Sequence, residues 1–194
     1  MRTRLDRRFG HRRIGFINGG VTYNYSVLRR QGFQRAADAL GLPLDAELLR
    51  AGATTTGRGA AEARSLFGLA LPPTAIVAAT DMCALGVIGA ATDLGLRVGK
   101  DVSVIGYDGV PEGAFVTPSL TTFAVDSRRA GERLADILLK RILGAAPETL
   151  RETAPAHLVA RGSDGPPALT PAELRELIDT NANITTDITT GRTK

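Results

Sequence analysis

The sequence is poor in the residues that build redox and metal sites, since its 194 residues include one cysteine, two histidines and no tryptophan. The single cysteine, Cys83, excludes an internal disulfide and a cluster of thiolate ligands. His11 and His157 lie far apart in the sequence and do not have the spacing of a metal-binding pair. We therefore expect a chain without a bound metal or cofactor.

Long apolar runs are also lacking, and no stretch approaches the roughly 18 consecutive apolar residues of a transmembrane helix. The first 13 residues are basic but have no apolar stretch of the kind found in secretory signals. With 43% hydrophobic and 23% charged residues, the composition is that of a globular chain, neither disordered nor fibrous. We expect a cytoplasmic protein without membrane contact, built as one domain or two small subdomains.

Positive charge is concentrated at the beginning of the chain. The net charge is +4, yet residues 1–13 contain six arginines and one aspartate, so the rest of the chain carries a net charge of −1. A DNA-binding domain usually carries its positive excess on a folded face. This basic leader has two interpretations, a solvated arginine-rich end, which is the more common, or an arm that contacts DNA.

After residue 13, short apolar runs alternate with longer segments of helical periodicity, as in β-α-β units. The predicted strands cover residues 12–19, 47–52, 74–80, 101–109 and 120–125. The predicted helices cover residues 26–40, 58–69, 81–94 and 127–143. Right-handed crossovers then give an α/β fold with an open parallel sheet and helices on both faces.

The end of the chain follows another pattern. Residues 154–163 are expected to be extended, and Thr170, Pro171 and Glu173 form the capping box of a short helix over 171–179. The final residues are polar and have no helical or strand face, so we expect them to be disordered.

Motifs of common enzyme classes are missing. The glycine-rich segment after the first predicted strand has neither the GxGxxG pattern nor a Walker pattern ending in Gly-Lys-Ser/Thr. The sequence contains no GxSxG elbow, no obvious base for Cys83 and no distinctive pair of carboxylates. Cys83 is better explained as a small buried residue of a helix. We therefore expect no enzyme activity.

Polar and aromatic residues follow the predicted strands at the points where ligands bind in open parallel sheets. Tyr25 and Arg29 come after the first strand, Asp81 after the third and Asp108 after the fourth. Such a group suits a polyhydroxylated ligand, because a carboxylate accepts from hydroxyls while an arginine donates in a fixed fork.

Each of these residues also has a simpler explanation. Asp81 can cap its helix, and Arg29 can be a surface cation. Tyr25 can pack within its loop, and Asp108 can form a turn. Their convergence on one edge of the sheet is what favours a binding site.

Four segments occur in a distinctive order and spacing, namely GHRRIGFING at 10–19, RRQGF at 29–33, the stretch from Pro73 to Leu139 and HLVARGS at 157–163. Within the long stretch, TDMCALG, DVSVIGYD and LTT are the most specific. Residues 10–163 thereby resemble the effector-binding region of the LacI/GalR (lactose-repressor/galactose-repressor) family of transcriptional regulators.

The resemblance implies a core of the periplasmic-binding-protein type with two lobes, of which this chain is similar mainly to the C-terminal one. Family members bind a sugar or nucleobase effector between the lobes and act as dimers that carry a helix-turn-helix headpiece. The resemblance implies effector contacts for Arg29 and Asp81 and a contact position at Tyr25. Thr54 falls where an aromatic residue often stacks on the ligand, and Asp108 completes the expected ligand-binding set.

The resemblance also suggests a division of the chain. We expect a basic leader (1–13), a C-terminal effector-binding lobe (14–110 and 151–163), a crossover with a remnant of the N-terminal lobe (111–150, with strand 120–125 and helix 127–143) and a tail (164–194). The headpiece and most of the first lobe are expected to be absent. The apolar face of helix 127–143 must then repack, pair with another chain or stay exposed.

The leading interpretation is the effector-binding and dimerisation portion of a LacI-type regulator, with residues 53–68 and 81–95 in the dimer interface. Its partners would be a small-molecule effector, in first place a carbohydrate, and a second copy or a full-length relative. DNA would be reached only through a headpiece that this chain lacks. The alternatives are a fragment of a sugar-binding solute-capture protein and a non-functional remnant of a repressor gene.

Overall fold

Six short strands form a single sheet in the order β2-β1-β3-β4-β5-β6 in a computed structural model that describes residues 10–190. The strands are β1 (Ile14–Ile17), β2 (Leu49–Arg50), β3 (Ala75–Ala78), β4 (Ser103–Asp108), β5 (Thr121–Ala124) and β6 (His157–Val159). The first five run parallel to their neighbours, and β6 is antiparallel to β5. The predicted open, mainly parallel α/β sheet is confirmed.

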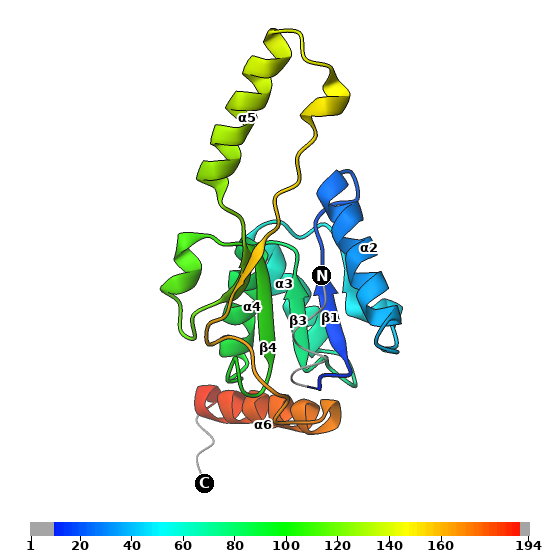
Figure 1. Cartoon of the computed structure of the whole chain (residues 1–194). Helices are drawn as coiled ribbons and strands as arrows, with labels where there is room; N and C mark the ends of the chain where they lie inside the picture. Colours follow the sequence, from blue (N-terminus) through cyan, green and yellow to red (C-terminus); the bar gives the residue numbers. More distant parts are fainter. Residues whose placement is uncertain (1–9, 191–194) are drawn as a thin grey trace.

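Helices cover both faces and one end of this sheet (Figure 1). The helices are α2 (Asn24–Asp38), α3 (Thr56–Phe67), α4 (Asp81–Asp93), α5 (Ser127–Ile142) and α6 (Pro171–Thr190), with short 3₁₀ helices η1 (Ala46–Leu48), η2 (Pro111–Ala114) and η3 (Pro147–Leu150). Figure 1 shows α2 on one face, α3 and α4 on the other, and α6 across the end opposite to α5. None of these described helices has the length and apolarity needed to cross a membrane.

Alternation of side chains along the strands divides the core into two layers. On the face under α2, Phe16 of β1 stacks on Phe33 with ring centroids 4.6 Å apart. On the other face, Ile17 and Ile76 pack with buried residues of α3 and α4, among them Leu66. Both faces of the central strands are therefore buried, as their continuous apolar sequences require.

Helices α3 and α4 approach each other closely because glycines stand at their contact. A Cβ at Gly59 would lie 2.3 Å from the carbonyl oxygen of Cys83, and a Cβ at Gly86 would lie 2.0 Å from that of Thr56. Cys83 is fully buried there, as expected, and burial raises the pKa of its thiol to about 12. A thiol with such a pKa is protonated at neutral pH and is a poor nucleophile.

The structure corrects the expected place of the strand at 120–125. β5 pairs with β4, with Thr121 opposite Ile105, so it is the fifth strand of the sheet and not a remnant of another lobe. Hydrogen bonds hold β5 in the sheet, since the buried Thr121 and Thr122 bond to the side chains of Ser163 and Asp81. Helix α5, in contrast, has no buried residue and stands away from the sheet (Figure 1).

The interpretation of residues 1–13 as a solvated end is wrong for His11 and Arg13, whereas Gly10 and Arg12 are exposed, and residues 1–9 lie outside the described part of the chain. His11 is 1% exposed, with its Nδ1 2.9 Å from the hydroxyl of Thr74 and its Nε2 2.9 Å from the carbonyl oxygen of Gly165. The guanidinium of Arg13 pairs with Asp45 and Glu47. Hydrogen bonds and ion pairs thus attach this segment to the body.

The tail is more ordered than its polar sequence suggests, because α6 extends to Thr190 instead of ending at residue 179. The predicted capping box is present, with Glu173 accepting from the backbone N–H of Thr170 at 2.7 Å. Leu174 and Ile178 are buried against the α3–α4 side of the core. Tertiary packing therefore stabilises a helix whose later residues have weak helical propensity; residues 191–194 lie outside the described range.

Two polar side chains of α6 also bind the ends of neighbouring helices. Arg175 donates to the carbonyl oxygen of Phe67 at 2.7 Å, and Asn181 donates to that of Leu94 at 2.9 Å. These oxygens belong to the carboxyl ends of α3 and α4, where backbone carbonyls lack helical partners. The tail is thus a structural part of the sheet domain.

Candidate functional site

Three of the five predicted site residues meet at the carboxyl ends of the strands. The guanidinium carbon of Arg29 lies 4.7 Å from the ring centroid of Tyr25 and 3.9 Å from that of Tyr107. Its Nη2 is 3.6 Å from Oδ1 of Asp108. A cation between two aromatic rings and beside a carboxylate forms one compact polar group, which we call the Arg29 group (Tyr25, Arg29, Tyr107 and Asp108).

Arg29 is fixed from three sides. Its Nη1 donates to the carbonyl oxygen of Ala79, which directly follows β3. The rings of Tyr25 and Tyr107 hold the guanidinium plane by cation–π contact. An arginine has five N–H donors, so the side chain retains donors for a ligand while its orientation is already set.

Asp108 sits at a strained turn at the end of β4. Its φ of +130° is the only positive φ of a non-glycine residue within the described range, and Gly109 follows with a φ of +83°. Burial raises the pKa of the Asp108 carboxyl above its ordinary value, Arg29 counteracts this rise, and Asp81 adds to it. The group is therefore a half-buried acceptor that faces a fixed cation.

Asp81 lies beneath this turn and is fully buried. Its Oδ2 accepts hydrogen bonds from the backbone N–H groups of Gly109 at 2.8 Å and Val110 at 2.9 Å. Its Oδ1 accepts from the hydroxyl of Thr122 at 2.6 Å. Both carboxylate oxygens are thus directed into the protein, and the side chain does not reach the rim.

Local sequence explains how Asp81 comes to this place. Thr80, and not Asp81, caps α4, since its hydroxyl accepts from the backbone N–H of Cys83 at 3.3 Å. Gly106 of β4 leaves the space that the carboxylate fills, because a Cβ there would lie 2.1 Å from Oδ1 of Asp81. Asp81 therefore joins the start of α4 to β5 and to the turn after β4.

Thr54 is exposed and belongs to the segment between β2 and α3. The neighbouring Ala53 donates its backbone N–H to the carbonyl oxygen of Asn18 at 3.0 Å, which ties this segment to the loop after β1. Among the described residues, Thr54 forms no hydrogen bond with the Arg29 group. It lies on the same edge of the sheet without joining that group.

Tyr107 is the residue of this group that was not among the predicted ligand-binding residues. Its ring also stacks on Phe123 of β5, with centroids 6.4 Å apart. The available signal was its place directly before Asp108 at the end of a strand, where a side chain can reach the ligand edge. Only the structure reveals that this ring lies over Arg29.

The chemistry of the Arg29 group is that of recognition. It offers donors from a guanidinium, acceptors from a carboxylate and two aromatic surfaces, which together match a ligand with several hydroxyls. In the part of the chain that the structure describes, no three histidine, cysteine, aspartate or glutamate side chains are grouped so that they could hold a metal ion.

Comparison with known sequences shows which proteins the chain is similar to. The model of the periplasmic binding protein-like domain matches residues 7–163. The HTH-type transcriptional repressor PurR of Yersinia pestis (strain Antiqua) is 36% identical over 159 residues, which are 81% of this chain and 47% of the relative. The HTH-type transcriptional regulator AglR of Rhizobium meliloti (strain 1021) is 36% identical over 168 residues, 84% of this chain and 47% of the relative. The chain spans about half the length of these curated relatives.

Solved structures agree with this comparison. A LacI family regulator from Mycobacterium smegmatis is similar with a TM-score of 0.74 and 30% identity, over 81% of this chain and 59% of that one. The lac repressor dimer bound to operator and the anti-inducer ONPF has a TM-score of 0.75 and 30% identity, over 81% and 54%. The complex of the regulator CelR with cellobiose has a TM-score of 0.70 and 32% identity, over 79% and 47%.

Proposed function

The chain belongs to the family of periplasmic binding protein-like domains, among the LacI-type transcriptional regulators, and we propose that it is the effector-binding portion of such a regulator, working in the cytoplasm. The observation that carries this proposal is the Arg29 group, in which Arg29 lies between Tyr25 and Tyr107 and beside Asp108. This is a preformed polar site at the sheet edge where ligands of this fold class bind.

The effector that best suits this site is a carbohydrate. Vicinal hydroxyls can donate to the Asp108 carboxylate and accept from the remaining N–H groups of Arg29. The exposed part of Tyr25 offers an apolar surface for a sugar ring. CelR, a similar protein, was solved in complex with the sugar cellobiose.

Asp81 has a supporting role in this proposal and does not contact the effector. It fixes the backbone N–H groups of Gly109 and Val110, and this holds the turn that aims Asp108 at Arg29. A buried carboxylate with three donors is a rigid anchor, since charge-assisted hydrogen bonds are among the strongest in proteins. Asp81 is thus a positioning residue.

Assembly with a second copy or with a longer relative is part of the proposal. We retain residues 53–68 and 81–95 as the interface, because α3 and α4 lie side by side and Met82 is 42% exposed on α4. Phe115, next to η2, is 86% exposed and adds apolar surface. We assign DNA contact to a headpiece that is not among the described residues.

The test is a thermal melt of the chain with a panel of monosaccharides, disaccharides and nucleosides. A ligand at 100 times its Kd stabilises the native state by about 2.7 kcal/mol, which is a visible rise in Tm. We expect one class of sugar to raise Tm, and we expect Arg29→Gln and Asp108→Asn to abolish the rise. Arg12→Gln, an exposed arginine outside the group, is the matched control and should leave it unchanged.

Three outcomes would overturn the assignment. A cooperative melt that no sugar changes would remove the proposed carbohydrate specificity. A rise in Tm caused only by nucleosides would replace the carbohydrate with a nucleobase ligand. A sugar-dependent rise that persists in both Arg29→Gln and Asp108→Asn would place the binding site elsewhere.

A further inference from the structure

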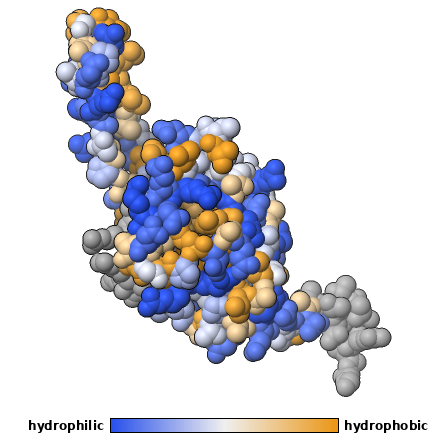
Figure 2. Space-filling view, turned by 90° about the vertical axis from the view of Figure 1, so that its right-hand side faces the viewer, coloured by the Kyte–Doolittle hydropathy of each residue, from blue (hydrophilic) through white to orange (hydrophobic). Residues whose placement is uncertain are grey.

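A second pocket, with a volume of about 420 Å³, lies along α2. Its apolar floor includes Val21, Val27 and Ala51, and its polar rim includes Arg30 and Arg35. Helix α2 lies on the side of the molecule that faces the viewer in Figure 2, and this side has a hollowed apolar area bordered by hydrophilic residues. The volume is within the range of sites for small organic molecules.

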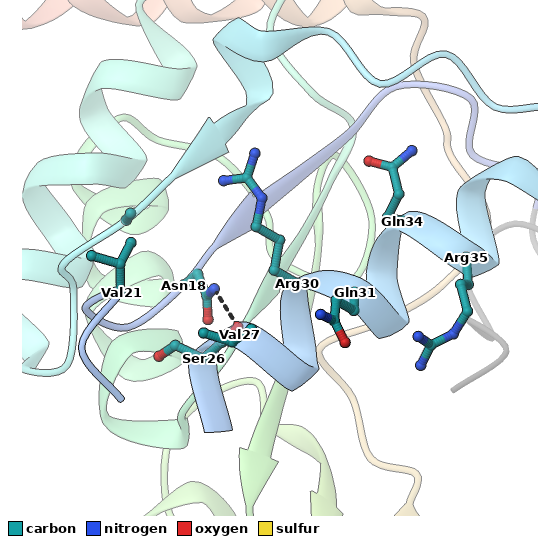
Figure 3. A pocket seen from close by; sticks show the side chains of 9 residues that line it. Asn18, Val21, Ser26, Val27, Arg30, Gln31, Gln34 and Arg35 are labelled. Carbon is teal, nitrogen blue, oxygen red and sulfur yellow. Dashed lines mark hydrogen bonds between the residues drawn. The ribbon is translucent and has the colours of Figure 1, made fainter. Parts of the chain in front are cut away.

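This pocket is separate from the Arg29 group. Successive residues of a helix are turned by about 100°, so Arg29 and Arg30 leave α2 in different directions. Arg29 is directed at Tyr107 and Ala79, whereas Arg30 lines the pocket. In Figure 3, Arg30 and Gln34 leave the helix on one side and Arg35 on the other, so the two arginine side chains diverge from α2.

The rim has donors that the protein does not use. Within the described residues, the side chains of Arg30, Gln31 and Arg35 form no hydrogen bond or ion pair. The one acidic residue of α2, Asp38, accepts a hydrogen bond from Gln34 at 2.9 Å. Two unpaired guanidiniums beside an apolar floor favour a ligand that carries a negative charge.

Ser26 also lines the pocket, but its hydroxyl is buried. Ser26 is 1% exposed, and its hydroxyl has no hydrogen-bond partner within the described chain. The neighbouring Asn18 donates its Nδ2 to the carbonyl oxygen of Ser26 at 2.9 Å, which fixes this wall (Figure 3). A Cβ at Gly19 would lie 2.5 Å from the Ser26 hydroxyl and 2.5 Å from that of Tyr25, so the Ser26 hydroxyl faces the loop after β1 and is not offered to a ligand.

We propose that this pocket is a second ligand site, independent of the effector site, and that it binds a small organic anion. The carboxylate or phosphate group of the ligand contacts Arg30, while Arg35 adds positive charge from the other side of α2, and the apolar part of the ligand lies on Val21, Val27 and Ala51. Carboxylates and phosphate esters share this chemistry, and the choice between them is left to the probes.

The experiment is a titration of the full chain followed by ¹H–¹⁵N NMR, with phenyl phosphate, benzoate and inorganic phosphate as probes. We expect saturable shifts at residues 21–35 and at Ala51 with phenyl phosphate or benzoate, and the stronger of the two identifies the anion class. Inorganic phosphate should bind at least about tenfold more weakly, because it has no apolar part for the floor.

Variants separate this site from general charge effects and from the effector site. Arg30→Gln should raise the Kd about tenfold, and Arg35→Gln should raise it by a smaller factor. Arg58→Gln, an exposed helical arginine outside the pocket, should not change the Kd, and neither should Arg29→Gln. Circular dichroism melts of each variant check that it is folded.

Two results would overturn the proposal. Equal weakening by Arg30→Gln and Arg58→Gln, or equal affinity for inorganic phosphate and the two organic anions, would mean unspecific attraction of charge. Loss of binding in Arg29→Gln with no change in Arg30→Gln and Arg35→Gln would mean that the anion occupies the effector site.

Discussion

The carboxylate of Asp81 accepts a hydrogen bond of 2.6 Å from the hydroxyl of Thr122. The two residues are 41 positions apart in the chain, and both are completely buried. This bond connects the first residue of α4 with β5, while the other oxygen of Asp81 holds the turn after β4. One buried carboxylate thus fixes two neighbouring strands and the position of Asp108.

The first prediction concerns this anchor. Asp81→Ala leaves two backbone N–H groups and one hydroxyl without partners, and we expect the free energy of unfolding to fall by about 3 kcal/mol. Urea denaturation measures this change. Asp93→Ala is the matched control, because Asp93 also lies on α4 but is 62% exposed and pairs with Arg64 of α3. This variant should cost less than about 1 kcal/mol.

The same variant distinguishes positioning from direct contact. A positioning role predicts that Asp81→Ala shifts the amide resonances of Gly109 and Val110 even without ligand. If Asp81→Ala keeps its stability and these resonances but no longer binds the effector, Asp81 contacts the ligand directly and its assigned role is wrong.

The second prediction concerns Tyr107, whose ring lies 3.9 Å from the guanidinium carbon of Arg29. Tyr107→Leu keeps an apolar residue on β4 but removes the aromatic face. We expect the affinity for the effector to fall about three- to tenfold, because a cation–π contact contributes about 0.5–1 kcal/mol or somewhat more. Isothermal titration calorimetry measures the change. Tyr107→Phe retains the face and should bind like the parent chain, whereas equal loss in both variants would assign the effect to the hydroxyl.

The third prediction is that the Asp108 carboxylate strengthens effector binding but lowers the thermal stability of the chain. Burial raises the pKa of this carboxyl, so ionising it costs more free energy in the folded chain than in the unfolded chain. Asp108→Asn removes the charge and should raise Tm while it weakens effector binding by at least about tenfold. Asparagine also tolerates a positive φ better than most residues. A lower Tm in Asp108→Asn would show that the contact with Arg29 outweighs the cost of burial.

The fourth prediction concerns acid stability. Burial lowers the pKa of His11, although the carbonyl of Gly165 and the charge of Asp164 act in the opposite direction. The unfolded chain therefore binds a proton at higher pH than the folded chain, so the free energy of unfolding should decrease as the pH falls below about 6.5. The decrease should end once the pH lies below the lowered pKa of the folded state.

Urea denaturation between pH 5 and 8 tests this linkage, with the exposed His157 as the internal comparison. His157→Asn should keep the pH dependence of the parent chain. His11→Asn should be less stable at pH 8 and should show a flatter dependence near pH 6. An unchanged slope in His11→Asn would assign the linkage to other groups.

The fifth prediction concerns two leucines in different helices. Leu174 of α6 is completely buried, whereas Leu138 of α5 is 59% exposed. Leu174→Ala should lower the free energy of unfolding by about 2–5 kcal/mol, and Leu138→Ala by less than about 0.5 kcal/mol. A large loss in Leu138→Ala would mean that α5 packs against another surface in solution.

The exposed face of α5 makes a related measurement useful. Its exposed apolar residues are Leu134, Leu138, Leu139 and Ile142. Leu134→Lys combined with Leu138→Lys should leave the unfolding transition unchanged and reduce self-association in light scattering, because contiguous apolar patches drive association. Unaltered scattering would show that association uses another face.

The periodic pattern of the chain determined the types of its main elements. Alternating apolar runs and helical segments predicted the strands and helices within a few residues, because the spacing of apolar side chains is a local property. Turn and cap residues did the same for the start of α6, where Thr170 and Glu173 bond as the capping box predicts. The sequence also placed Arg29 and Asp108 on one edge, because the carboxyl ends of parallel strands share that edge.

The tertiary structure alone decided which residues serve which role. The sequence around Thr121 and Thr122 predicted a strand but not that β5 pairs with β4, since strand pairing depends on a partner that is not adjacent in sequence. Asp81 and Asp108 are both acids that follow a strand, yet one is buried beneath the turn and the other faces Arg29. The continuation of α6 to Thr190 likewise rests on contacts with α3 and α4. Burial and pairing of this kind arise from packing between remote segments, and local spacing does not encode them.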